Sequence, residues 1–183
     1  MGKKEKTAQK QKEEEIEEQL KLLDQEYSFW FLFNVHVHKL VYLLSIACLV
    51  FDIMDAVNLI WYKKYVTLTT VAIRTLFDLL LLIGNRKYKQ WMFVFFLFSK
   101  IVQSCLVVFY MIYLTLTVTD VIKHSERFDK YLVTVERTPD AIAGAYVALL
   151  LLLLLLGIVI YLVVRDYYYI GKRKEITVDS DDD

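Results

Sequence analysis

Four apolar segments constrain this chain more than any other feature. They occupy about 38–61, 66–84, 91–117 and 141–164, and each reaches the roughly 20 residues that a helix needs to cross a bilayer. The chain is 57% hydrophobic, above the usual range of about 45–50% for soluble domains. A membrane β-barrel would instead alternate polar and apolar residues along short strands. We therefore expect an all-α polytopic membrane protein, a bundle of four transmembrane helices.

The connections predict how these spans are arranged. Residues 62–65 and 85–90 are so short that the spans they join must be antiparallel neighbours. The third connection is longer and contains the only proline, Pro139, placed to start the fourth helix. We expect a charged amphipathic helical tail over 1–32, a four-span membrane domain over 33–164 with a luminal or extracellular loop at 118–140, and a tail over 165–183.

The distribution of lysine and arginine predicts the orientation of the spans. With four spans, both termini and the 85–90 turn share one side of the membrane. That side carries 14 Lys and Arg residues, whereas the 62–65 and 118–140 connections together carry six. Cytoplasmic loops are enriched in these residues, so we expect cytosolic N- and C-termini.

The first span carries polar residues that are costly in lipid. Asp52, Asp55 and Asn58 are spaced three residues apart, which places them along one face of a helix. A carboxylate near the centre of a bilayer costs at least ~2.5 kcal/mol on insertion scales. Two bases in other spans, Arg74 and Lys100, are the expected counter-charges.

The hairpin geometry predicts one polar layer across the first three spans. Centring the first turn near residue 63 or 64 places Arg74 between Asp52 and Asp55, and the second turn brings Lys100 to the depth of Arg74 and Asp78. Gln103 follows on the third span, and the eight leucines at 149–156 should lie outside the layer and face mainly lipid. The layer either holds the helices in register or forms a proton or ion path, because three acids meet only two bases.

Two further patterns are candidate interaction sites. Glu18, Leu22 and Leu23 have the acid-xxx-Leu-Leu form of a dileucine sorting signal, which would contact a clathrin adaptor; the same leucines also fit the apolar stripe of an amphipathic helix. Gly144 and Ala148 form a small-xxx-small pair that would allow close approach of another helix.

Other chemistry is not indicated. The sequence has no phosphate-binding loop, no nucleophile elbow and no zinc-protease motif, so we expect neither an enzyme nor a cofactor. His36 and His38 would point apart on a helix, which argues against a metal site. Net charge is zero and most bases flank the spans, so we expect no nucleic-acid partner.

Several short stretches resemble the lysosome-associated four-span transmembrane protein family, including its divergent invertebrate members. The matching stretches are FNVHV at 33–37, IGNRKY at 83–88, and IY at 160–161 followed by basic and aromatic residues. The resemblance covers roughly 32–174 in layout. Family members carry cysteines before the first span and Pro-Tyr motifs that recruit ubiquitin ligases; this chain has neither, so ligase recruitment is not expected.

The resemblance implies an endosomal or lysosomal membrane protein, with the plasma membrane or endoplasmic reticulum as alternative locations. It implies a regulator or trafficking adaptor of other membrane proteins, in contact with membrane lipid and membrane-protein partners. The charged residues within the spans suggest an alternative, a small proton-coupled transporter or channel accessory subunit.

Overall fold

The computed structural model describes residues 2–29, 35–61, 65–118 and 139–178. A charged helix and a short two-stranded hairpin precede four long helices. The elements in order are α1 (Gly2–Glu26), β1 (Ser28–Phe29), β2 (Val35–His36), α2 (Val37–Trp61), α3 (Tyr65–Arg86), α4 (Gln90–Val118) and α6 (Pro139–Val178). The last four are long and apolar enough to cross a membrane. The prediction of an all-α, four-span, multi-pass integral membrane protein is confirmed.

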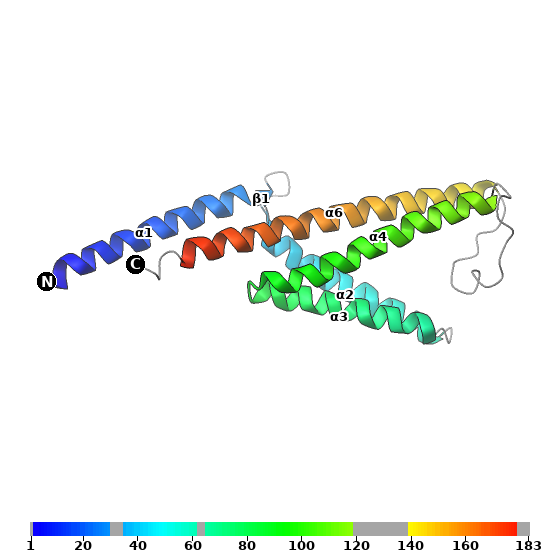
Figure 1. The fold of residues 1–183 in the computed structure, drawn as a ribbon, viewed down its shortest axis with the longest axis horizontal. Helices are drawn as coiled ribbons and strands as arrows, with labels where there is room; N and C mark the ends of the chain where they lie inside the picture. The colour runs from blue at the N-terminus through cyan, green and yellow to red at the C-terminus, as the bar shows by residue number, and fades with distance from the viewer. Residues whose placement is uncertain (1, 30–34, 62–64, 119–138, 179–183) are drawn as a thin grey trace.

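The four long helices form two pairs that meet at one end and diverge at the other (Figure 1). α2 packs along α3, and α4 packs along α6. The pairs cross where the α3–α4 turn, the start of α2 and the C-terminal third of α6 come together. From there the α2–α3 pair and the α4–α6 pair separate (Figure 1). We call the closed end the junction.

Local chemistry explains where the helices begin and end at the junction. The side chain of His36 accepts a hydrogen bond from the backbone N–H of His38 at 3.1 Å, which caps the first turn of α2. At the end of α3, the N–H of Lys89 donates to the carbonyl of Gly84 at 2.9 Å. A Cβ on Gly84 would lie 2.8 Å from the Cβ of Met92, so only glycine permits this close turn.

The hydrophobic core lies at the junction and includes α1. Buried side chains from α1, α2, α4 and α6 form one cluster, in which Leu23, Val37, Phe93, Val163 and Ile170 are each at most 6% exposed. The antiparallel hairpin, with Ser28 opposite His36, returns the chain from α1 to the start of α2. The charged N-terminal helix is therefore anchored to the membrane domain by its last turn.

The outer surfaces of the four long helices are apolar and exposed. Large exposed side chains occur on each of them, including Phe51, Leu76, Phe98 and Leu154. Apolar surface on this scale would be unusual for a soluble monomer and fits contact with lipid acyl chains. Trp61 and Trp91, at helix ends, are 83% and 55% exposed, as expected for aromatic side chains at a membrane interface.

The fourth helix differs from the sequence expectation in length. α6 continues without a break from Pro139 to Val178, so the residues after 164 extend the helix instead of beginning a separate tail. The last part of this helix packs against α1. Most of the predicted loop at 118–140, together with Phe33 and Asn34 of the FNVHV stretch, lies outside the described residues.

The predicted close contact at Gly144 is not found within the described part of the chain. A Cβ built at Gly144 meets no described atom within 4 Å, so no described helix approaches this side of α6 closely. Ala148 lies one turn further along the exposed part of the same helix. A contact of Gly144 and Ala148 with another protein remains a prediction.

Candidate functional site

Polar residues from α2, α3 and α4 come together in the middle of the membrane domain. We call Asp52, Asp55, Arg74, Asp78, Lys100 and Gln103 the membrane cluster. Arg74 lies between two carboxylates, as the hairpin geometry predicted: its Nε donates to Asp52 at 2.5 Å and its Nη2 to Asp55 at 2.6 Å. One guanidinium thereby ties two turns of α2 to α3 through charge-assisted hydrogen bonds.

The third helix joins the cluster through Lys100. Its Nζ lies 3.6 Å from a carboxylate oxygen of Asp78, and both side chains are buried. Arg74 and Lys100, one cation from each ion pair, line the same cavity as Asp52, which places the two ion pairs in one cluster. The five charged residues that the sequence predicted at one depth therefore do meet. Asn58 is exposed on α2.

A cavity of about 370 Å³ opens beside the cluster. Asp52, Asp55, Arg74, Lys100 and Gln103 form its polar side. The opposite wall is apolar and comes from α6, through Leu152, Leu155, Leu156 and Val159. The expectation that the leucine-rich helix lies outside the polar layer is therefore wrong on this one face, although Leu150, Leu151 and Leu154 are exposed as expected for lipid contact.

The membrane cluster contains acceptors that lack a donor. Among the described residues, the second carboxylate oxygen of Asp52 and the amide oxygen of Gln103 are buried without a hydrogen-bond donor, and so are both oxygens of Asp78, which lies 3.6 Å from Lys100. Asp55 is different, because its side chain is 55% exposed. Such a cluster can hold a proton, a cation or a hydrogen-bond donor.

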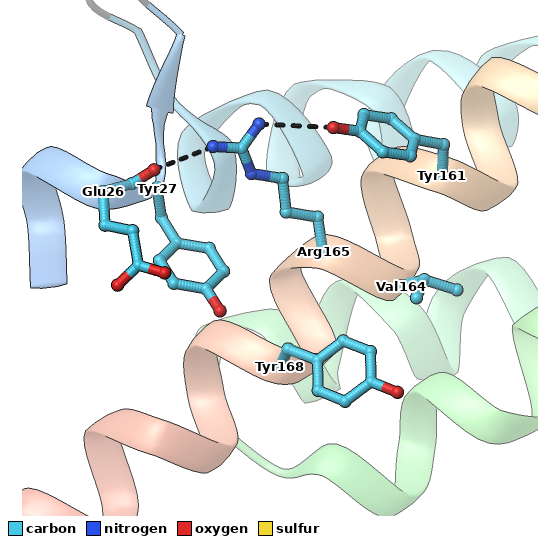
Figure 2. Close-up of a pocket in the computed structure, with 6 residues that line it drawn as sticks. All are labelled: Glu26, Tyr27, Tyr161, Val164, Arg165 and Tyr168. Carbon is cyan, nitrogen blue, oxygen red and sulfur yellow. Dashed lines mark hydrogen bonds between the residues drawn. The ribbon is translucent and has the colours of Figure 1, made fainter.

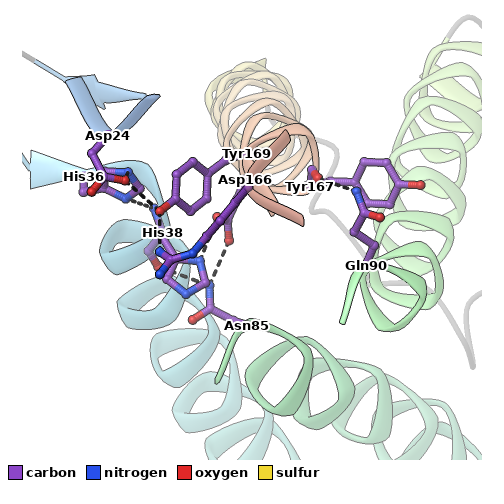
Figure 3. A network of polar contacts seen from close by, with 9 residues as sticks. Asp24, His36, His38, Asn85, Gln90, Asp166, Tyr167 and Tyr169 are labelled. Atoms are coloured by element: carbon purple, nitrogen blue, oxygen red, sulfur yellow. Dashed lines mark hydrogen bonds and ion pairs between the residues drawn. The ribbon is translucent and has the colours of Figure 1, made fainter. Parts of the chain in front are cut away.

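A second group of polar residues lies at the junction, and the sequence did not predict it (Figure 3). We call Asp24, His36, His38, Asn85, Asp166 and Tyr169 the junction cluster. Asp166 of α6 is completely buried, yet both of its oxygens are paired. His38 Nδ1 donates to one at 2.9 Å, and Asn85 Nδ2 donates to the other at 2.8 Å. Three helices thus meet on one carboxylate.

The same cluster extends outward to α1. The hydroxyl of Tyr169 donates to Asp24 at 2.8 Å, and Arg173 donates to that hydroxyl at 2.9 Å. The ring of His36 packs edge-on against Tyr169, with centroids 4.5 Å apart. Burial lowers the pKa of His36 below its usual value, and this outweighs the opposing attraction of Asp24, 3.6 Å away. The neutral imidazole is the form that can accept the α2 cap hydrogen bond.

Aromatic stacking and backbone contacts complete the junction. Tyr88, with a positive φ of 51°, stacks on His38 with ring centroids 4.6 Å apart. The guanidinium of Arg173 lies over the Tyr88 ring, 4.7 Å from its centroid. Gln90 donates to the carbonyl of Tyr167 at 3.0 Å, linking the start of α4 to α6 (Figure 3). A Cβ on Gly171 would lie 2.5 Å from this amide nitrogen.

Arg165 holds the end of α1 against α6 beside a pocket of about 340 Å³ (Figure 2). Its guanidinium donates to the carbonyl of Glu26 at 2.8 Å and lies 4.4 Å from the ring centroid of Phe29. Lys172, two turns further along the same face of α6, pairs with the Glu26 carboxylate at 3.0 Å. These contacts fix the orientation of α1 where it leaves the junction.

This docking separates the two leucines of the candidate sorting signal. Leu22 is 61% exposed, whereas Leu23 is 6% exposed and belongs to the junction core. Glu18 is exposed on α1, one turn before Leu22. An adaptor that binds both leucines would therefore need α1 to leave the junction first.

Sequence reasoning missed the junction cluster for identifiable reasons. His36 and His38 were treated as two positions of one helix, but His36 precedes α2. Asp166 falls within the cytosolic tail that the sequence predicts over 165–183. A signal was present, since Tyr169, Ile170 and Ile176 continue an apolar face and no proline interrupts it. Over the residues that the structure describes, no group of three potential metal ligands occurs.

Comparison with known proteins gave no match: no family model, no curated protein and no solved structure is similar to this chain. The structure shows an integral membrane protein with four spanning helices. One polar cluster lies within the spans, and a second lies at the junction.

Proposed function

We propose that this protein is a non-enzymatic regulator or trafficking adaptor of other membrane proteins, acting in endosomes or lysosomes. One observation carries the proposal: polar groups lie exposed on a face of α2 within the spanning segment. Asp55 is 55% exposed and Asn58 is also exposed, while their neighbours Met54 and Val57 are apolar. Polar groups facing lipid are costly even where one of them, Asp55, is paired with Arg74, whereas a protein partner would shield them from lipid.

Recovery from native membranes tests this proposal. We expect the full chain, extracted in a mild detergent, to co-purify with at least one other multi-pass membrane protein. Replacing Asp55 and Asn58 together by Ala should release that protein, whereas Leu150→Ala with Leu154→Ala, on exposed lipid-facing positions of α6, should not. Recovery of the chain alone, or equal loss with both double variants, would argue against the proposal.

The compartment has a separate basis. The resemblance to the lysosome-associated family and the acid-xxx-Leu-Leu pattern both favour the endolysosomal system over the plasma membrane or the endoplasmic reticulum. We expect a tagged chain to overlap with lysosomal markers, and Leu22→Ala to shift it toward the cell surface. Leu22 is the appropriate test position because it is exposed, so its replacement should not disturb the junction core. Unchanged staining would remove the signal from the proposal.

A second function, a proton-coupled transporter or channel accessory subunit, is favoured by a different observation. Asp78 and Lys100 form a buried ion pair beside the cavity, at 0% and 5% exposure. Buried ionisable groups within spans commonly belong to proton relays. Reconstituted protein should then carry a pH-dependent flux in liposomes that Asp78→Asn abolishes while the protein stays folded. The absence of any flux would leave the first proposal as the better one.

A further inference from the structure

We propose that the cavity beside the membrane cluster receives a lysine or arginine side chain from a transmembrane helix of a partner protein. The inference rests on the proposed function and names the chemistry of the partner. It places the contact in the cavity between α2 and α6, which is lined by Asp52, Asp55 and Gln103 on one side and by leucines on the other.

Charge is the first argument. The described cluster contains three carboxylates, on Asp52, Asp55 and Asp78, and two cations, on Arg74 and Lys100. One negative charge therefore lacks a counter-charge among these residues. Within a bilayer such a charge is neutralised by a proton or by a cation from outside the chain.

Hydrogen bonding favours a cation over a proton. Asp52 is 3% exposed, and its second carboxylate oxygen lacks a described donor. The amide oxygen of Gln103 is also buried and also lacks a described donor. Both residues line the cavity, and both atoms are acceptors. A single added proton supplies one donor, whereas an ammonium carries three and a guanidinium five. A basic side chain beside Asp55, whose side chain is 55% exposed, therefore brings more donors to the cluster than a proton does.

The shape of the cavity favours entry from the bilayer. Its volume of about 370 Å³ far exceeds the ~30 Å³ that one water occupies in the liquid. Phe51 and Leu155, which line it from α2 and α6, are 66% and 57% exposed, so the opening faces the surroundings of the bundle. The α2–α3 and α4–α6 pairs diverge beyond the junction (Figure 1).

The walls suit a long basic side chain. Leu152, Leu156 and Val159 present an apolar surface opposite the carboxylates. The aliphatic stem of lysine or arginine packs on such a surface while its charged end reaches polar groups. Asp55 lies toward the exposed side of the cluster and would meet the incoming charge first, whereas Asp52 lies deeper.

Site-specific photo-crosslinking in the full chain tests the inference. A benzoylphenylalanine at Phe51, at the cavity mouth, should capture a transmembrane peptide that contains Lys or Arg. The same probe at Leu150, which is 56% exposed but does not line the cavity, is the matched control and should not capture that peptide. Asp55→Asn should lower the Phe51 crosslink at least tenfold without lowering the amount of the protein in the membrane.

A charge exchange provides the second arm. Replacing the basic residue of the captured peptide by Asp should abolish the crosslink, and combining that change with Asp55→Lys should restore it. If Asp55→Lys does not fold, the Asp substitution in the captured peptide still tests the inference, because it is made without any change in this chain. Restoration is expected only if the two charges contact each other directly.

Three results would overturn the inference. The first is that the probe at Phe51 captures a transmembrane segment without a basic residue. The second is that it captures only an amine dissolved in the membrane and no protein. The third is that the probe at Leu150 captures the same peptide to the same extent. If a partner co-purifies but crosslinks elsewhere, the proposed function stands and this inference fails. If no partner co-purifies at all, the proposed function fails with it.

Discussion

The two polar clusters of this protein differ in how completely they are paired. At the junction, the buried carboxylate of Asp166 receives one donor on each oxygen, from His38 and Asn85. In the membrane cluster, Asp52 keeps one buried oxygen without a described donor and Asp55 is half-exposed. The buried carboxylate of the junction cluster is paired within the chain on both oxygens, whereas that of Asp52 in the membrane cluster is paired on one.

This difference suggests a division of labour. A buried carboxylate with a donor on each oxygen is costly to disturb, because removing it leaves those donors short of an acceptor. It fits a structural role at the point where α1, α2, α3 and α6 meet. An under-paired cluster beside an open cavity has capacity for something else. The predictions that follow test whether the two clusters differ in this way.

The largest effect is expected at Asp166. Asp166→Ala would remove the acceptor of His38 Nδ1 and one of the two acceptors of the buried Asn85 amide, which also donates to the His38 carbonyl; each loss should cost about 1–3 kcal/mol. The thermal midpoint of the detergent-solubilised protein should fall sharply or the protein should not accumulate. Asp140→Ala, at the exposed start of the same helix, should leave the midpoint unchanged. A stable Asp166→Ala protein would show that the junction is not the more constrained cluster.

Leu23 should give the next largest effect. Leu23→Ala removes a buried side chain from the junction core, a change that commonly costs about 2–5 kcal/mol. Because Leu23 is on α1, we expect α1 to detach and become sensitive to protease. Leu22→Ala is the control, since its side chain is 61% exposed and its replacement should change stability by less than about 0.5 kcal/mol. Equal protease sensitivity of both variants would contradict this docking.

Acid should weaken the junction through His36. Burial lowers its pKa in the folded protein, so the unfolded chain binds a proton more readily. Stability should be constant above the usual histidine pKa of about 6.5 and should fall as the pH drops below it. The protection factors of the amides in the first turn of α2, which are corrected for the intrinsic exchange rate at each pH, should then be lower at pH 5 than at pH 7.5.

A matched variant isolates this effect. His36→Asn keeps a side chain that caps helices well and does not titrate. In this variant, the protection of amides in the first turn of α2 should no longer depend on pH, once exchange rates are corrected for the intrinsic effect of pH on amide exchange. If His36→Asn and the parent protein respond equally to acid, another group controls the junction.

The smallest effect on stability is expected at Asp55. In Asp55→Asn, Arg74 keeps its hydrogen bond to Asp52, and the carboxylate that is lost is half-exposed. The thermal midpoint of the isolated protein should shift only slightly, corresponding to a loss of less than about 1 kcal/mol in the free energy of unfolding. A loss as large as that of Asp166→Ala would mean that the membrane cluster is as structural as the junction cluster.

Sequence reasoning succeeded where the chain itself sets the register. A short turn joins α2 to α3, so residues equally far from the turn must face each other, and Arg74 could be placed between Asp52 and Asp55. The same argument brought Lys100 to Asp78. It could not place α6, because the connection over 118–140 is too long to fix a register. The leucine wall of the cavity was missed for that reason.

The junction was missed because it depends on contacts between distant segments. Asp24, His38, Asn85 and Asp166 lie far apart in the sequence, and none stands out by composition. Asp166 looks like an ordinary charged residue after a span. Only the crossing of α6 over the start of α2 turns it into a buried acceptor.

The sequence by itself determined the four spans and the meeting of charges within the first three, because length, hydropathy and short turns are local properties. The tertiary structure decided which acceptors are paired, since pairing depends on distances between helices that no local pattern encodes. It also decided that Leu23 is buried while Leu22 is exposed, because α1 lies on α6 with one face only.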